Sequence, residues 1–437
     1  MKKVLTLILG LSCLAANAQK KWSLRECVDY ATTHNLQVIQ NEYSKQMQDL
    51  NLRIAKKNYL PSVSGNLGNS VSFGQASLGT GSIRNDRFSN NANISADMLV
   101  YNNGRLEKTI RKTEFDVEAS QYDIETIKND ISLQIAQQYL TTLLNKEIVK
   151  ISQAAVENAQ KQYDRAKITT SVGTTAQTIL AEAEAGLARE KQNLKTAEIN
   201  VGRSLFALVQ LLQLQEYKDF DVEDVDVPDQ LAPQLKSVDE VLVTAYENQP
   251  QIKAAESRIR SAEAQTEVTR TAFWPTLTAS VGFGTFYNNL LNTNSNVGFF
   301  PQYKDNFGQQ GGVSLNIPIF NKGITKLQVE QSKLNENIAK VTMQQQKQSV
   351  RENVQKAQFD VDANYEIYLS AVQTEKSTKL ALDFADKSYA AGRSTIYDVN
   401  VARNNYANAQ GTVAQSKFNY LFSLKLLNFY AGIPLSL

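Results

Sequence analysis

Four segments of the chain alternate between apolar and polar residues with a period of two, which is the pattern of a β-strand with unlike faces. The alternating apolar residues are Val63, Leu67, Val71 and Phe73 in the first segment, Ala92, Ile94, Ala96, Met98 and Val100 in the second, Leu277, Ala279, Val281 and Phe283 in the third, and Val313, Leu315, Ile317 and Ile319 in the fourth. Such strands fit either a half-buried sheet in a soluble protein or a sheet in an outer membrane, with lipid on one face and water on the other.

Four strands are too few to close a barrel in an outer membrane, which takes at least eight. If the strands span lipid, several chains must therefore combine their strands. The loops that join the strands of each pair, residues 74–90 and 288–308, are polar and rich in turn residues. These loops would lie outside the cell.

A helix is predicted before each pair of strands. Ser23, followed three residues later by Glu26, is a capping box that opens a helix. This helix is expected to run to about Tyr59, because Pro61 cannot continue it. The second half of the chain repeats the same signals at Ser237, Glu240 and Pro275.

Two very long helices are predicted after the strand pairs. The proline-free stretch 105–167 has about 63 residues, and at about 1.5 Å per residue it would make a helix of roughly 95 Å. The stretch 325–391 is its counterpart. Helices of this length exceed any globular core and must pack against neighbours along their whole run. Each ends in a turn of small residues, around Gly173 and Gly392, after which a helix returns.

The chain is an internal repeat, because residues 23–215 reappear in altered form as residues 237–437. Leu99–Gly104 pairs with Pro318–Gly323, and Gly173 pairs with Gly392. The predicted domains are residues 1–18, a signal peptide; 19–215, the first repeat; 216–236, an acidic linker; and 237–437, the second repeat. The linker is expected to be solvated, although its carboxylates could also hold a metal ion.

The first 18 residues have the features of an export signal. Lys2 and Lys3 precede the apolar run Val4–Leu14, and Ala16-Asn17-Ala18 is a cleavage site of small residues. The apolar run is too short to span a bilayer. Cys13 lies inside it, so lipidation of this cysteine is not expected. The sequence therefore predicts an exported protein.

Charge and composition exclude several function classes. The 46 basic and 44 acidic residues balance once Lys2 and Lys3 are removed, so no basic surface for nucleic acid is expected. The mature chain keeps one cysteine, Cys27, and one histidine, His34, which we interpret as ordinary residues of the first helix. A disulfide framework, a His/Cys metal site and a histidine-based catalytic pair all lack parts. We therefore expect neither an enzyme nor a cofactor.

Two segments near the C-terminus carry a family resemblance. They are YAAGRSTIYDVNVARNNYANAQ, Tyr389–Gln410, and FNYLFSLKLLNFYAGIPL, Phe418–Leu435. Together with the repeat, the strands and the export signal, they make the chain similar to the TolC-like outer-membrane efflux protein family. The resemblance covers the whole mature chain.

The resemblance implies a mixed α/β membrane protein that is mostly long helices. Three chains would pool four strands each into a 12-stranded β-barrel in the bacterial outer membrane, and their helices would form a helical barrel in the periplasm. Such a homotrimer is the exit duct of a multi-component efflux or type I secretion system. Its implied partners are outer-membrane lipid, a periplasmic adaptor (membrane fusion) protein, and an inner-membrane pump or ABC transporter.

The same resemblance implies a gate at the periplasmic end of the helices. Three copies of Asp398 would form a ring of carboxylates that repel one another and attract cations. Tyr389 matches the aromatic residue that helps to lock the two hairpins of the family, and Arg393 and Ser394 lie where the family often has an arginine at the tip. Asp398 could instead cap the helix that follows the turn.

Two positions depart from the family pattern. Val401 replaces an acidic residue one turn after Asp398, and Ile179 replaces a carboxylate in the first hairpin, which leaves Thr178 as the nearest polar side chain. The residues implied to face the adaptor are Gly173, Thr174, Gly392 and Arg393.

A trimeric coiled-coil surface scaffold or adhesin without a conduit is the alternative function. Strand pairs that lie midway in each repeat disfavour it, because an adhesin places its barrel at one terminus.

Overall fold

The computed structural model describes residues 21–79, 81–216, 218–225, 237–292, 297–433 and 435. The predicted signal peptide and residues 226–236 of the linker lie outside these ranges. The chain divides into two compact units. We call them the helical unit (Met1–Tyr43, Tyr122–Lys253 and Gln345–Leu437) and the sheet unit (Ser44–Gln121 and Ala254–Gln344). Both repeats contribute to both units.

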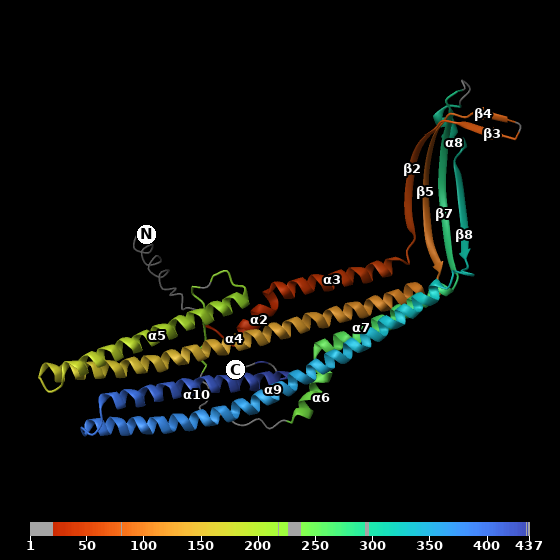
Figure 1. Ribbon diagram of the computed structural model, residues 1–437. Coiled ribbons are helices and arrows are strands. Elements are labelled where there is room, and N and C mark those ends of the chain that lie inside the picture. Colours follow the sequence, from red (N-terminus) through yellow and green to blue (C-terminus); the bar gives the residue numbers. More distant parts are fainter. Residues whose placement is uncertain are drawn as a thin grey trace, which may run out of the picture. The chain divides into compact units, whose positions relative to one another are not determined.

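The sheet unit contains the four predicted strands, which form one antiparallel sheet (Figure 1). They are β2 (Ser62–Ser72), β5 (Arg87–Tyr101), β7 (Thr276–Leu290) and β8 (Gly308–Asn316), in the order β2-β5-β7-β8. The last strand is shorter than predicted: it ends at Asn316, so Ile317 and Ile319 lie beyond it. Pro318 has no N–H to donate and cannot extend the ladder.

The register places the apolar residues of all four strands on one face. Ala96 lies opposite Val63, Ile94 opposite Phe283, and Val313 opposite Ala279. Directly paired residues share a face of the sheet, so the serines, threonines and asparagines between them share the other. The apolar face is uncovered over much of its area, and Val63 and Leu67 are each 70% exposed. The predicted alternation is therefore confirmed within the paired segments; Phe73 lies beyond the end of β2, and Val100 lies at the β-bulge in β5.

The two loops of the sheet unit contain secondary structure that the sequence did not predict. A small hairpin, β3 (Gln75–Leu78) and β4 (Gly81–Arg84), lies in the first loop, and a short helix, α8 (Phe299–Asp305), lies in the second. Asp86 holds the base of the first loop: it accepts hydrogen bonds from the Gly74 N–H (3.1 Å), the Arg84 guanidinium (2.7 Å) and the Asn292 amide (3.0 Å).

Helices in the sheet unit contact one another mainly through polar side chains. The unit takes in much of α3 (Leu36–Lys57), most of α7 (Pro250–Arg270), and the first turns of α4 (Arg105–Ser171) and α9 (Ile324–Ala390). Contacts between these helices include Ser261 Oγ to Asp116 (2.5 Å), Arg260 to Glu118 (3.1 Å) and Thr269 to Ser332 (3.1 Å). Polar interhelical contacts of this kind are suited to helices that have two opposite sides exposed to water.

The helical unit is built from two hairpins of long helices (Figure 1). In one hairpin α4 turns into α5 (Gln177–Leu212), and in the other α9 turns into α10 (Ile396–Tyr430). The bounds of α4 and α9, 67 residues each, agree with the long helices predicted from the sequence. The short helices α2 (Leu24–His34) and α6 (Val238–Asn248) also belong to this unit.

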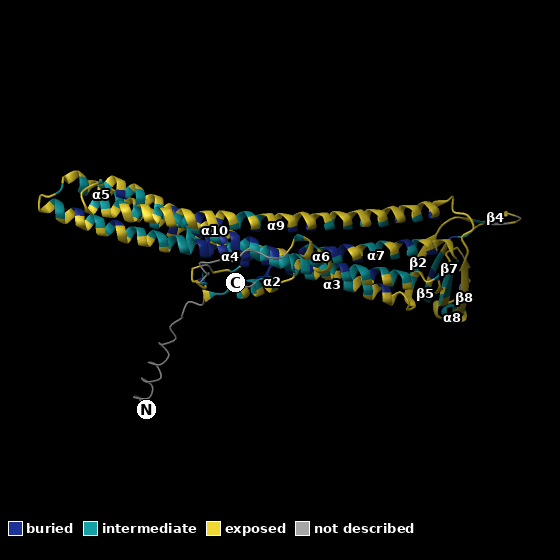
Figure 2. Cartoon of the chain, turned by 90° about the horizontal axis from the view of Figure 1, so that it is seen from below, coloured by how far each residue is buried: buried dark blue, intermediate teal, exposed yellow. Residues whose placement is uncertain are grey.

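The core of the helical unit lies where these elements meet, and Figure 2 shows its buried residues around α4 and α10. It includes Ile135 and Tyr139 of α4, Leu208 and Leu212 of α5, and Phe418 of α10. Cys27 of α2 is fully buried in this core, and burial raises the pKa of its thiol to about 12. A thiol with so high a pKa is unreactive at neutral pH.

The helix predicted from Ser23 to about Tyr59 is interrupted at Asn35, which has extended backbone angles and separates α2 from α3. The Asn35 side chain accepts a hydrogen bond from the N–H of Gln37 (2.8 Å) and so caps α3. The second repeat breaks at Gln249, which is extended because Pro250 follows it. Both helices begin where predicted: Ser23 forms a full capping box with Glu26, whereas Ser237 accepts a bond from the Glu240 N–H (3.4 Å) without the reciprocal half.

The described part of the linker is partly packed: Phe220 and Val222 are buried, while Glu216, Asp219, Glu223 and Asp224 are exposed as expected. Residues Asp221–Val222 form a strand, β6, parallel to β1 (Lys21–Trp22). Lys146 of α4, whose side chain is 15% exposed, binds Asp221 (2.8 Å) and Asp224 (3.0 Å). Lys21 binds Asp224 from the other side (2.7 Å), and these contacts, led by Lys21, lower the pKa of the Asp224 carboxyl.

Two further observations concern the described residues only. They contain no group of three or more His, Cys, Asp or Glu side chains arranged to hold a metal ion. Within the same ranges, no helix combines the length and the apolar character needed to cross a membrane.

Lys146→Met should destabilise the helical unit by about 1–3 kcal/mol, because it removes the less exposed of the two lysines that Asp221 and Asp224 share. Lys161→Met, an exposed site on the same helix, is the control and should change stability by less than about 0.5 kcal/mol. Thermal unfolding followed by circular dichroism measures both. Because the pKa of Asp224 is lowered in the fold, the difference between Lys146→Met and wild type should shrink as pH falls below about 4. Equal effects of the two substitutions would contradict this account.

Candidate functional site

The ends of the two helical hairpins are the candidate site, and both turns have the same backbone geometry. Gly173 and Gly392 have left-handed φ angles of 78° and 69°. The N–H of Gly173 donates to the Thr170 carbonyl (3.0 Å) and that of Thr174 to the Thr169 carbonyl (2.9 Å). This is the Schellman arrangement that ends a helix. The N–H groups of Gly392 and Arg393 make the equivalent bonds (3.0 and 2.9 Å).

Glycine is required at both turns for its backbone rather than for lack of space. A Cβ atom added at Gly173 or Gly392 would meet no atom within 4 Å. The positive φ angle alone therefore disfavours other residues. The two predicted tips are turns of the expected kind, and both present an open surface. That this surface faces an adaptor remains a prediction.

The polar residues beside the glycines differ in how they are held. The Thr174 hydroxyl donates to the Thr169 carbonyl (2.8 Å), and the Ser394 hydroxyl lies 3.5 Å from the Ala385 carbonyl. Arg393 is exposed, and no ion pair of its side chain is found within the described residues. Its charge is therefore available at the tip.

Asp398 lies in the first turn of α10 and forms a capping box with Thr395. Its carboxylate accepts hydrogen bonds from the Thr395 hydroxyl (2.7 Å) and from the Thr395 N–H (2.8 Å). The Thr395 hydroxyl in turn accepts a bond from the Asp398 N–H. These bonds, first that of the hydroxyl, lower the pKa of Asp398. The carboxylate thus caps its helix, and it is also exposed and negatively charged at neutral pH.

Tyr389 of α9 contacts the other hairpin. The Arg165 guanidinium carbon of α4 lies 6.0 Å from the centre of the Tyr389 ring, within the range of a cation–π contact. The aromatic residue expected to lock the hairpins therefore meets a partner in the first hairpin. The partner is an arginine of α4, on the other arm of the hairpin from Ile179 of α5, and the resemblance did not indicate it.

Arg403 of α10, which sequence reasoning missed, pairs with a carboxylate of its own hairpin and attracts one of the other. Its side chain is only 18% exposed, and its guanidinium lies 3.6 Å from the Asp386 carboxylate of α9. Burial lowers the pKa of Arg403, while Asp386 and Glu190 of α5 oppose this effect. One buried cation thus interacts with a carboxylate of each hairpin. No sequence signal marks it, because an arginine on a polar helix is usually solvated.

Arg403 borders a hollow of about 300 Å³ between α5 and α10. Val401 also lines this hollow. It gives the hollow an apolar side chain at the position where the family pattern has an acidic one. Gly186 of α5 lines the hollow from the other side. The two hairpins are therefore separated here by space as well as by charge.

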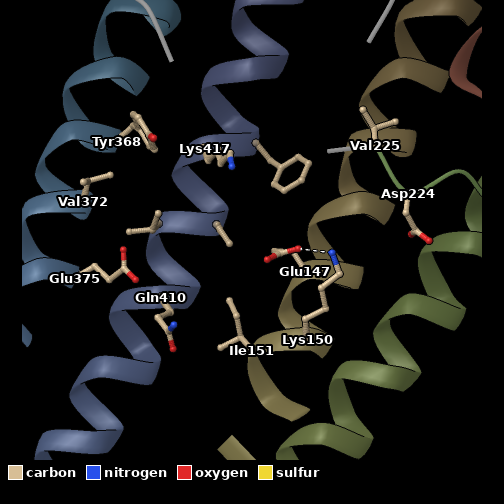
Figure 3. Close-up of a pocket in the computed structure, with 13 residues that line it drawn as sticks. Glu147, Lys150, Ile151, Asp224, Val225, Tyr368, Val372, Glu375, Gln410 and Lys417 are labelled. Carbon is tan, nitrogen blue, oxygen red and sulfur yellow. Dashed lines mark hydrogen bonds and ion pairs between the residues drawn. The ribbon is translucent and has the colours of Figure 1, made fainter. Parts of the chain in front are cut away.

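A larger cavity of about 640 Å³ lies further along the hairpins (Figure 3). Glu147 and Lys150 of α4, Glu375 of α9 and Lys417 of α10 line it, with Asp224 of the linker. Glu147 and Lys150 form an ion pair (2.9 Å). Charges of both signs line this cavity, and its lining contains no His or Cys that could serve as a metal ligand or nucleophile. We therefore interpret it as a hydrated space between the hairpins.

Comparison with known proteins places these features in context. A family model described as "Outer membrane efflux protein" matches residues 29–213 and 241–432. The outer membrane protein TolC of Escherichia coli K12 is 26% identical over 307 residues, which cover 68% of this chain and 60% of TolC. The outer membrane efflux protein BepC of Brucella suis is 21% identical over 96% of this chain and 88% of its own.

Among solved structures, the Campylobacter jejuni CmeC outer membrane channel superposes with a TM-score of 0.72 at 22% identity, covering 94% of this chain and 85% of that one. The likeness establishes that the two chains share a fold. The family model spans both repeats and omits the linker.

Arg403→Gln should loosen the contact between the hairpins, because it removes a positive charge that attracts Asp386 of its own hairpin and Glu190 of the other. We expect amide hydrogen exchange near Glu190 in α5 and near Arg403 in α10 to speed up by about tenfold, which corresponds to about 1–2 kcal/mol. Lys387→Gln, an exposed site next to Asp386, is the control and should leave exchange unchanged. Unchanged exchange in both variants would show that Arg403 does not join the hairpins.

Proposed function

Because this chain belongs to the outer membrane efflux protein family, we propose that three copies of it assemble into a passive exit duct. It is a protein of the bacterial outer membrane. The duct would carry its cargo across the periplasm and the outer membrane, and the energy would come from partners in the inner membrane.

The observation that carries this proposal is the sheet β2-β5-β7-β8. Its apolar face is exposed, and its outer strands β2 and β8 have no partner along their free edges within the described chain. Unpaired edges attract further strands, and three copies of four strands give the twelve that an outer-membrane barrel can use. In such a barrel the apolar face meets lipid and the face of serine, threonine and asparagine lines a watery lumen.

The long helices would continue the duct through the periplasm. Each of α4 and α9 has 67 residues, which makes a helix of about 100 Å. The Gly173–Thr174 and Gly392–Arg393 turns would then face a periplasmic adaptor protein, which links the duct to an inner-membrane pump or ABC transporter. Their exposed backbone and the free charge of Arg393 support this role.

The periplasmic entrance would be narrowed by three Asp398 carboxylates. Three negative charges on one axis repel each other and favour cations, especially multivalent ones. The Tyr389–Arg165 contact and the attraction between Arg403 and Glu190 would hold the hairpins together around this ring. Because both contacts are polar, water can replace them, so the hairpins can separate at a modest energetic cost.

Conductance in planar bilayers tests the proposal and separates it from a trimeric scaffold without a conduit. We expect purified wild-type protein to form ion-conducting channels that prefer cations. Asp398→Asn should lower the cation preference and weaken block by trivalent cations, because it removes three charges from the narrowest point. Thr395→Val is the control, since it removes the hydroxyl of the capping box but keeps the charge.

Protein that enters bilayers without conducting would refute the duct. Channels in which Asp398→Asn and Thr395→Val behave alike would retain the duct and place its selective constriction elsewhere.

A further inference from the structure

All four connections between strands and helices lie at the same end of the strands. The register pairs the first residue of β7, Thr276, with the last of β8, Asn316, and places Leu277 beside Tyr101 at the end of β5. Ser62, the first residue of β2, pairs with Asp97 nearby in β5. We call the four connecting segments, residues 57–61, 102–106, 271–275 and 317–323, the helix-side rim.

The helix-side rim is positively charged. It contains Lys57, Arg105 and Lys322 and no acidic residue. All three side chains are exposed, and within the described residues none of them forms an ion pair. Two neighbouring cations further from the sheet are neutralised: Lys56 pairs with Glu114 (3.5 Å) and Arg270 with Glu267 (2.6 Å). Lys326 is exposed, and no ion pair of its side chain is found within the described residues. Free positive charge is thus present at the rim and directly beside it.

Two of the three rim cations sit on fixed backbone turns. Asn103 and Gly104 have φ angles of 55° and 71° just before Arg105, and Lys322 and Gly323 have φ angles of 59° and 78°. The two repeats therefore use the same left-handed turn. A turn of this kind has few alternatives, so it holds each cation close to the end of its strand.

Large exposed side chains accompany the charges. Tyr59, Tyr101, Phe273, Trp274 and Phe320 lie at or beside the rim and are 46–84% exposed. A β-bulge between Leu99 and Tyr101 shifts the register and brings Tyr101 opposite Leu277 of the apolar face. Aromatic residues at this position are typical of the level of lipid headgroups.

The loops at the opposite end of the strands have a different charge pattern. Arg84 is paired there with Asp86 (2.7 Å), and Lys304 is followed by Asp305. Arg87 is exposed at that end too, and no ion pair of its side chain is found within the described residues, but the carboxylates of Asp86 and Asp305 lie in the same loops. A group of cations with no carboxylate among them is therefore a property of the helix-side rim.

We propose that the helix-side rim binds the phosphate groups of anionic phospholipids in the leaflet nearest the helices. Unpaired lysine and arginine at a membrane surface attract anionic headgroups, and the aromatic side chains beside them would lie among the glycerol and upper acyl groups. A trimer would present nine rim cations. This inference rests on the proposed membrane duct and specifies the lipid that it selects.

The test uses the full mature protein in detergent, to which phosphatidylglycerol and phosphatidylcholine are added in equal amounts. Native mass spectrometry measures how much of each lipid stays bound. We expect the wild type to retain phosphatidylglycerol at least about tenfold over phosphatidylcholine at low salt, and to lose most of this preference in 1 M salt.

A triple variant, Lys57→Gln with Arg105→Gln and Lys322→Gln, should lose the preference. The matched control, Lys161→Gln with Lys376→Gln and Lys379→Gln, removes the same number of exposed cations from α4 and α9 outside the sheet unit. It should retain the wild-type preference.

Equal retention of the two lipids by the wild type would overturn the inference whether or not the variants fold, and so would an equal loss in the triple variant and its control. Channel formation in neutral lipid bilayers is measured separately. Channels without lipid preference would leave the duct intact and remove only the rim as a lipid site. Absence of any bound lipid and of any channel would remove the duct itself.

Discussion

The sheet β2-β5-β7-β8 leaves two kinds of group unsatisfied, and the arrangement of the molecule depends on how they are satisfied. One is the apolar face, whose valines, leucines and phenylalanines are exposed. The other is the pair of free edges on β2 and β8. Exposed apolar area costs about 25 cal/mol per Å² in water, and a long unpaired edge invites association. Lipid can satisfy the first and further copies of the chain the second, and a closed ring of copies in a membrane satisfies both.

The helices obey a different constraint, because they are too long for a single core. Apolar packing is concentrated where α2, α4, α5 and α10 meet, around residues such as Tyr139 and Leu208. Lys146 of α4 binds Asp221 of β6 and Asp224, and β6 in turn pairs with β1. Beyond this region, toward the hairpin tips, Arg165 of one hairpin meets Tyr389 of the other, and Arg403 is attracted by Glu190 across the same gap. A gated conduit needs helices that stay packed in an apolar core and hairpin tips whose polar contacts can open.

Much of the fold could be predicted from sequence, for reasons that particular residues make clear. Alternation around Ile94 and Phe283 predicted the sheet, because a period of two has one structural meaning. Pro250 is a sequence signal for the helix break at Gln249. The break at Asn35 has almost no such signal, since apolar periodicity continues on both sides of it. The turns at Gly173 and Gly392 were found because left-handed backbone strongly favours glycine.

The candidate site was less accessible to sequence reasoning. Asp398 could be identified by resemblance, and its capping partner Thr395 by spacing, but neither observation distinguishes a cap from a gate. Arg403 and Arg165 were missed, because a single arginine on a polar helix looks like any solvated one. Only the packing of α10 against α5 and α9 makes Arg403 a buried charge. Likewise, no feature of the sequence indicated that Lys146 of α4 pairs with Asp221 and Asp224 of the linker.

Disulfide trapping between copies tests most directly whether the sheet is completed by other copies of this chain. Ser64→Cys on β2 is combined in turn with Ser314→Cys, Gly312→Cys or Gln310→Cys on β8, all on the polar face. Cys27 is buried and will not compete. The account predicts that at least one pair gives covalent trimers on oxidation, since edge strands in register bring Cα atoms within about 4.4–6.8 Å. The control pair, Ser95→Cys with Ser314→Cys, should give none because β5 is interior to the sheet. Monomers alone from every edge pair would contradict the account.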